Sequence, residues 1–139
     1  MVHRDVRSVA AIEEAEPSAW SVDLIEAELS QENAHCIVAC LDQVVVGWSC
    51  ARQGADEAEL LKLSVEVKHR RKAIGSALLK FVTTHLRKVG ICQIFLEVRF
   101  QNKAARSFYR RAGFTEIHRR ISYYNQPTDD AVILKKILQ

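Results

Sequence analysis

The stretch that decides the fold reads Val67-Lys68-His69-Arg70-Arg71-Lys72-Ala73-Ile74-Gly75-Ser76-Ala77. A run typical of a strand precedes it, and a long amphipathic run typical of a helix follows it. A strand that enters a helix through a tight turn of small residues aligns several backbone N–H groups at the positive end of the helix dipole. The stretch therefore predicts a diphosphate site. The alternative is a basic helix start on a solvent-exposed face.

The remaining sequence predicts helices and strands in a regular order around this turn. Helices are predicted after the caps Asp5, Ser21 and Asn102, and from Ile74 to a terminating Gly90. Strands are predicted at His35–Leu41, Val44–Cys50, Leu60–Val67, Ile91–Val98, Phe114–Tyr124 and Ala131–Leu138. In the third of these, Leu61, Leu63, Val65 and Val67 alternate with polar residues. The order α-α-β-β-β-α-β-α-β-β predicts an α/β or α+β fold with helices packed on one sheet.

Length and composition indicate one globular domain over residues 1–139. The chain is 48% hydrophobic and 27% charged, and no apolar stretch is long enough to span a membrane. No secretory signal is visible, so we expect a cytoplasmic protein. Residues 1–61 carry 3 Lys or Arg and 12 Asp or Glu, whereas residues 62–120 carry 15 and 3. The basic half suits an anionic ligand, either a nucleic acid or a phosphorylated cofactor, and the acidic half suits a basic ligand.

The cysteines and histidines show no metal or nucleophile pattern. Cys36 and Cys40 have no second pair to complete a zinc site, and we expect all four cysteines to be small buried hydrophobes. The five histidines lie near no Ser or Cys in a nucleophilic motif, so we expect packing or surface roles and no bound metal.

Residues 70–75 resemble motif A of the GNAT superfamily of N-acetyltransferases, whose pattern is Gln/Arg-x-x-Gly-x-Gly/Ala. Arg70 takes the first position and Gly75 the last, but Ala73 stands where the first glycine is usual. Alanine lacks the freedom of glycine at positive φ and adds a methyl group where a pyrophosphate would approach. The resemblance implies that acetyl-CoA is the co-substrate, bound more weakly than is usual in the family.

The C-terminal half resembles motif B of the same superfamily and, more narrowly, the RimI-type ribosomal-protein alanine N-acetyltransferases. The matching segments are Phe95-Leu96-Glu97-Val98-Arg99, Asn102-x-x-Ala105, Phe108-Tyr109-x-x-x-Gly113-Phe114, Tyr123-Tyr124, Asp130-Ala131 and the early Trp20-Ser21. The resemblance implies the GNAT fold, a single mixed, mostly antiparallel twisted sheet flanked by about four helices. Because only four residues precede Asp5, the family's first strand is expected to be short or missing.

The resemblance also implies roles for individual residues. Glu97, the only acid between Glu66 and Glu116, would be the general base, directly or through water. Tyr109 would be the general acid for the leaving thiolate. The alternatives are a salt bridge from Glu97 to Arg99 or another basic residue, and plain core packing for Tyr109. The implied cofactor contacts are Leu63, Ser64, Val65, Arg70, Arg71, Lys72, Ala73, Ile74, Gly75, Ser76 and Asn102, with a backbone N–H near Val65 polarising the thioester carbonyl.

Three functions are therefore open. The first is an acetyl-CoA-dependent N-terminal acetyltransferase for the alanine of a ribosomal protein, acting by direct attack in a ternary complex. The second is an acetyltransferase of the same fold for another protein N-terminus, a lysine or a small polyamine. The third is a basic RNA-binding module without catalysis. The absence of an aromatic platform and the presence of Glu97 and Tyr109 argue against it, so neither a nucleic acid nor a membrane is an expected partner.

Overall fold

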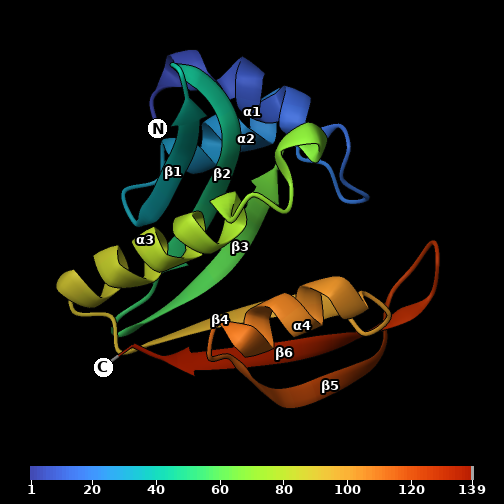
Figure 1. Ribbon diagram of the computed structural model, residues 1–139. Coiled ribbons are helices and arrows are strands. Elements are labelled where there is room, and N and C mark those ends of the chain that lie inside the picture. Colours follow the sequence, from blue (N-terminus) through green and yellow to red (C-terminus); the bar gives the residue numbers. More distant parts are fainter. Residues whose placement is uncertain (139) are drawn as a thin grey trace.

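The computed structural model describes residues 1–138, and all ten predicted elements occur in the predicted order (Figure 1). The helices are α1 (Val6–Glu13), α2 (Val22–Leu29), α3 (Ile74–Lys88) and α4 (Lys103–Arg111). The strands are β1 (Ala34–Leu41), β2 (Val44–Gln53), β3 (Glu57–Val65), β4 (Gln93–Arg99), β5 (Thr115–Tyr124) and β6 (Asp129–Ile137). Two short 3-10 helices, η1 (His3–Asp5) and η2 (Val67–His69), accompany them. No strand precedes α1 among the described residues.

The six strands form one sheet in the order β1-β2-β3-β4-β6-β5, and every neighbouring pair is antiparallel except β3 with β4. Helices cover both faces of this sheet (Figure 1). One core packs α3 and α4 against it around Val82, Leu86 and Ile94. A second core packs α1 and α2 against β2 around Ile25 and Trp48. The mixed, mostly antiparallel sheet with four helices confirms the predicted fold class.

The parallel pair β3–β4 is joined over a short distance only. Its register covers three positions, from Glu57 opposite Gln93 to Glu59 opposite Phe95. Beyond Glu59 the two strands diverge (Figure 1). The backbone of β3 up to Val65 therefore has no strand partner on its β4 side, and this split places the site described below.

The predicted alternation along β3 is broken by a bulge. Cys50 pairs with Lys62 and Ala51 pairs with Leu60, so Leu61 is an extra residue without a partner. Such an insertion exchanges the two faces of the strand beyond it. As a result Leu63 packs into the core under α3, whereas Lys62 points to the α1 side, where its ammonium meets Glu13. The prediction that Leu61, Leu63, Val65 and Val67 alternate in one continuous strand was wrong.

The predictions for helix caps, the end of β3 and the cysteines are confirmed in part. Ser21 caps α2 as predicted and accepts a hydrogen bond from the Leu24 backbone N–H at 3.2 Å. Asp5 instead has helical backbone angles at the end of η1, and its carboxylate accepts from the Val2 N–H at 2.8 Å. Val67 lies in η2, outside β3, and is exposed. A register shift at Cys40 leaves that cysteine exposed, whereas Cys50 is buried as predicted.

Candidate active site

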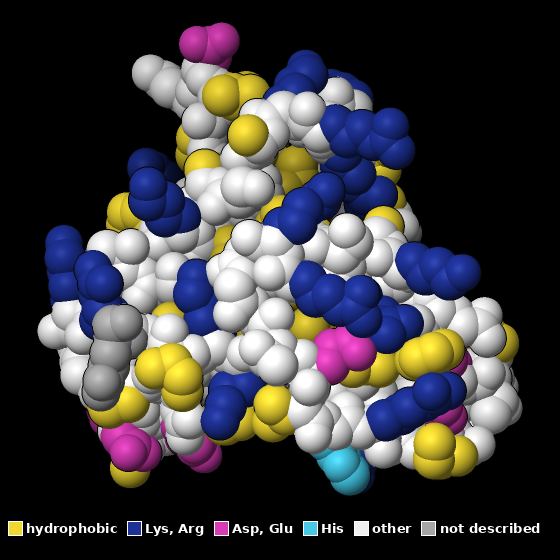
Figure 2. All heavy atoms as spheres, turned by 60° about the horizontal axis from the view of Figure 1, so that its bottom comes forward, with side chains coloured by type: hydrophobic (Ala, Val, Ile, Leu, Met, Phe, Trp, Pro, Cys, Tyr) yellow, Lys and Arg dark blue, Asp and Glu magenta, His cyan; other side chains and the backbone are white. Residues whose placement is uncertain are grey.

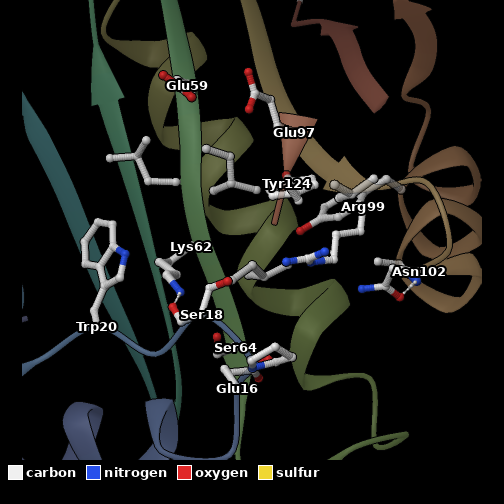
Figure 3. A pocket seen from close by; sticks show the side chains of 17 residues that line it. Glu16, Ser18, Trp20, Glu59, Lys62, Ser64, Glu97, Arg99, Asn102 and Tyr124 are labelled. Carbon is white, nitrogen blue, oxygen red and sulfur yellow. Dashed lines mark hydrogen bonds between the residues drawn. The ribbon is translucent and has the colours of Figure 1, made fainter. Parts of the chain in front are cut away.

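Two cavities meet at the split between β3 and β4. The turn-side cavity, of about 510 Å³, lies between β3, the turn that enters α3, and α4. The loop-side cavity, of about 390 Å³, lies between β3, β4 and the loop that joins α1 to α2 (Figure 3). Six residues line both cavities: Glu16, Leu63, Ser64, Asn102, Ala105 and Tyr109. Two ligands that enter from opposite sides can therefore meet at these side chains.

The structure brings most of the predicted cofactor contacts to the turn-side cavity. Nine line it: Leu63, Ser64, Val65, Arg70, Arg71, Ala73, Gly75, Ser76 and Asn102. Lys72 and Ile74 do not line it; Lys72 is exposed and Ile74 is half-buried. The predicted diphosphate turn thus forms one wall of a real cavity, while two of its residues face elsewhere.

The turn has the backbone shape that an anion site needs. Arg71 and Ala73 both have φ of 62°, and Ala73 is the left-handed N-cap of α3. The first N–H groups of a helix have no acceptor within it, and the first turn of α3 holds no acidic residue to occupy them. A Cβ on Gly75 would lie 3.6 Å from the Phe108 ring and 3.8 Å from Val65, two residues that line the cavity. A methyl group at position 75 would therefore make ordinary contacts with both side chains, at the wall of the cavity.

Replacing Ala73 by Gly is expected to raise the free energy of unfolding by about 1 kcal/mol, because an L-residue in the left-handed region is strained and glycine is not. Affinity for acetyl-CoA should stay equal or improve, since no contact is removed. Chemical denaturation and calorimetric titration measure the two quantities. Ala77→Gly, in the exposed interior of α3, is the matched control and should lower stability by about 1 kcal/mol. Destabilisation by Ala73→Gly would contradict the strain argument.

Tyr109 lies at the junction of the two cavities, buried in the second half of α4. Its ring makes edge-to-face contacts with Phe108 and Phe114 at centroid distances of 5.1 and 5.5 Å. Burial raises the pKa of Tyr109, and the negative charge of Glu16 raises it further. The phenol is therefore protonated at neutral pH and able to donate. Asn102 caps α4, since its Oδ1 accepts from the Ala105 N–H at 3.1 Å, and it also lines both cavities.

Glu97 lines the loop-side cavity and is absent from the walls of the turn-side cavity. Its carboxylate is 28% exposed and lies 3.4 Å from the Arg120 guanidinium, so the ion pair is long. The predicted alternative partner Arg99 instead donates to the carbonyl oxygens of Pro127 and Asn125. Glu97 thus has one long contact, with Arg120, and its side chain lines the cavity.

A second carboxylate faces Glu97 from the neighbouring strand. Figure 3 shows Glu59 on β3 and Glu97 on β4 at the same end of the loop-side cavity. Burial raises the pKa of Glu59, and the charge of Glu97 raises it further. This end of the cavity is therefore suited to a cationic ligand.

Sequence reasoning missed Glu13, the fully buried carboxylate behind the loop-side cavity. Its Oε1 accepts from Trp48 Nε1 at 2.9 Å and from the Ser64 hydroxyl at 3.1 Å. Its Oε2 accepts from the Trp20 backbone N–H at 3.0 Å and lies 3.0 Å from Lys62 Nζ. One side chain thus joins α1, the α1–α2 loop, β2 and β3. The sequence did contain a signal for its burial. Glu13 follows Val9 by four residues and Val6 by seven, and this helical spacing places it on the packed face of α1.

No metal centre accompanies these groups: within residues 1–138, no three His, Cys, Asp or Glu side chains gather as ligands. No described helix is long and apolar enough to cross a membrane. His35 and His85 instead contact each other, with ring nitrogens 3.0 Å apart, and His35 contacts the Gln53 side chain at 2.9 Å.

The sequence of residues 6–114 matches the family model described as the acetyltransferase (GNAT) family. The chain belongs to this family. Acetyltransferases of this family take the acetyl group from acetyl-CoA. The turn-side cavity brings a helix N-terminus and arginine side chains together, and both are groups that suit phosphate.

Three comparisons illustrate the similarity of this chain to known proteins. It is 39% identical over 83 residues to the ribosomal protein bS18-alanine N-acetyltransferase of Escherichia coli K12, a match that spans 57% of this chain and only 55% of that protein. It is 31% identical over 135 residues, 96% of this chain and 86% of the relative, to an uncharacterized N-acetyltransferase of Methanocaldococcus jannaschii. The solved ribosomal-protein-S18-alanine N-acetyltransferase of Escherichia coli superposes with a TM-score of 0.93 at 26% identity, covering 100% of this chain and 91% of that one.

Proposed function

We propose that residues 1–139 act as one N-terminal acetyltransferase domain that acetylates the α-amino group of an N-terminal alanine on a ribosomal protein. The observation that carries this proposal is that the two cavities meet at Tyr109, one lined by the carboxylates of Glu59 and Glu97 and the other by the start of α3 and arginines. The similarity to alanine N-acetyltransferases of ribosomal proteins supports the choice of acceptor. Because ribosomal proteins are made in the cytoplasm, the proposed reaction takes place there.

The proposed reaction is a direct transfer within a ternary complex. The acceptor occupies the loop-side cavity, loses a proton to Glu97 directly or through water, and attacks the thioester carbonyl with its neutral amine. A backbone N–H near Val65, on the part of β3 that β4 leaves free, polarises that carbonyl. The bond from the carbonyl carbon to sulfur then breaks, and Tyr109 gives its proton to the leaving thiolate. The attacking nitrogen loses its second proton as the amide forms, and this proton restores the Tyr109 phenol through water. No covalent acetyl-enzyme forms.

The test is transfer to a peptide that begins Ala-Arg, in the presence of acetyl-CoA, with product read by mass. An N-terminally blocked copy of the same peptide is the control. Transfer to the free peptide but not to the blocked one supports the proposal. Transfer to internal lysines of the blocked peptide, or to spermidine alone, would replace it by the second candidate, an acetyltransferase for another amine. The carboxylates Glu59 and Glu97 keep that candidate open, because they suit any cationic amine.

On the face that Figure 2 presents, the basic residues do not form one continuous patch. Figure 2 shows lysines and arginines spread between neutral side chains on the face it presents. Several of them are already paired: Arg106 and Arg110 contact Glu116 at 2.8 and 2.6 Å, and Arg119 contacts Asp130 at 2.6 Å. Charges held in this way are less available to phosphates, and so the arrangement favours catalysis over nucleic-acid binding.

Replacing Tyr109 by Phe is expected to lower kcat about 100-fold, the effect of losing a general acid, while the ring contacts with Phe108 and Phe114 remain. Steady-state kinetics with the Ala-Arg peptide measure the effect, and thermal unfolding checks that the fold is kept. Tyr123→Phe, outside both cavities, is the matched control. A wild-type kcat for Tyr109→Phe would discard the acid role.

A further inference from the structure

Among residues 1–138, one acidic residue lines both cavities: Glu16, in the loop between α1 and α2. The other five shared residues are neutral, and the carboxylates of Glu59 and Glu97 line the loop-side cavity but not the turn-side one. The acceptor nitrogen has to come within bonding distance of the thioester, and so it must reach the side chains common to both cavities. Glu16 is therefore the carboxylate that lies where the two cavities meet, whereas Glu97 would reach the nitrogen from within the loop-side cavity, directly or through water.

The Glu16 side chain is held in place on one oxygen and open on the other. Its Oε1 accepts from Arg70 Nη2 at 2.9 Å, and the same arginine donates from Nε to the Val65 carbonyl oxygen at 3.0 Å. Arg70 thus braces Glu16 against the end of β3. Oε2 of Glu16 has no hydrogen-bond partner within residues 1–138, and the carboxylate is 26% exposed. A carboxylate has lone pairs for more than one donor, so the braced group can still accept a hydrogen bond from a ligand.

The chemistry of the acceptor supplies the matching group. An α-amine or lysine amine is mostly an ammonium ion at neutral pH, with three N–H donors and a positive charge. Hydrogen bonds between an ammonium and a carboxylate are about twice as strong as neutral ones. The two basic groups of the loop-side cavity do not compete for Glu16, because Lys62 contacts Glu13 and Arg99 donates to backbone carbonyls.

We propose that Glu16, braced by Arg70, is the residue that binds and orients the ammonium group of the acceptor beside Tyr109. Glu97 then takes the proton, so that binding and deprotonation belong to two different carboxylates. This inference rests on the proposed function and adds to it the residue that holds the amine.

The decisive variant is Glu16→Gln, because glutamine keeps an oxygen for Arg70 and loses only the charge. We expect the KM for the Ala-Arg peptide to rise about 10- to 100-fold, the range for losing a hydrogen bond to a charged group. The kcat at saturating peptide and the dissociation constant for acetyl-CoA should change less than about 3-fold, well below that range. Glu14→Gln, an exposed acid two residues away, removes the same charge from outside both cavities and should leave the peptide KM unchanged.

Two results would overturn the inference for an active wild-type protein. The first is an unchanged peptide KM in Glu16→Gln. The second is a fall in kcat with an unchanged KM and an altered pH profile, which would make Glu16 the proton acceptor. A wild-type protein that acetylates no peptide N-terminus would overturn the proposed function and this inference together. The failures are therefore distinguishable.

Discussion

Replacing Glu97 by Gln is expected to lower kcat for the Ala-Arg peptide about 100- to 10,000-fold, the range for removing a general base. Glutamine keeps an oxygen that can accept the long hydrogen bond from Arg120, so the local geometry is retained. Affinity for acetyl-CoA should be unchanged, because Glu97 does not line the turn-side cavity. Single-turnover rates across the pH range and calorimetric titration with acetyl-CoA measure the two effects separately.

Glu57→Gln provides the control for this experiment. Glu57 lies on the same sheet and its carboxylate accepts a hydrogen bond from Gln93 at 3.1 Å, but it lines neither of the two cavities that meet at the split. Its variant should keep the wild-type rate. Equal rates for Glu97→Gln and the wild type at every pH would remove Glu97 as the base, and the proton would then have to leave by another group.

Replacing Glu13 by Ala is expected to lower the free energy of unfolding by about 3–5 kcal/mol, the cost of breaking a buried ion pair by removing one partner. The Lys62 ammonium, only 13% exposed, would lose its carboxylate, and the buried donors of Trp48 and Ser64 would lose their acceptor. The change is large compared with the total stability of a domain of this size. Urea denaturation followed by tryptophan fluorescence measures it.

Two further variants keep this prediction testable if Glu13→Ala does not fold. Glu13→Gln retains one oxygen acceptor for Trp48 and Ser64 but sets an amide against Lys62, so its stability should fall between Ala and wild type. Glu14→Ala, on the exposed face of the same helix, should change stability by less than about 0.5 kcal/mol. A Glu13→Ala protein as stable as the wild type would show that the four donors find water or other acceptors.

The order of elements could be predicted because local signals mark it. Ser21 and Asn102 cap their helices with the expected hydrogen bonds, and Gly90 and Gly113 adopt the positive φ that ends a helix. The turn before α3 was also predicted from the sequence. Ala73 stands at a motif position where glycine is usual, and it adopts the left-handed conformation that favours glycine. These features depend on neighbouring residues only.

The missed features depend on contacts between distant segments. Glu13 meets Ser64 51 residues away, and Arg70 meets Glu16 across 54. The bulge at Leu61 results from the register with β2, which no pattern within β3 reveals. The motifs predicted most of the residues that line the turn-side cavity. The loop-side cavity also takes Glu16, Pro17, Ser18 and Trp20 from the α1–α2 loop, and the sequence does not indicate the partners of that loop. The roles of Glu97 and Tyr109 themselves stay predictions.

The short ladder between β3 and β4 makes the stiffness of the sheet uneven. Each half is held by long antiparallel ladders, seven paired positions between β2 and β3 and seven between β4 and β6, whereas three join the halves. The three strands β1 to β3 and the three strands β4 to β6 are therefore joined only at the Glu57–Glu59 end of β3, and the sheet is least constrained between β3 and β4. A ligand that binds where the two cavities meet would add contacts between the halves at the place where the sheet itself provides none, and we expect it to slow hydrogen exchange there.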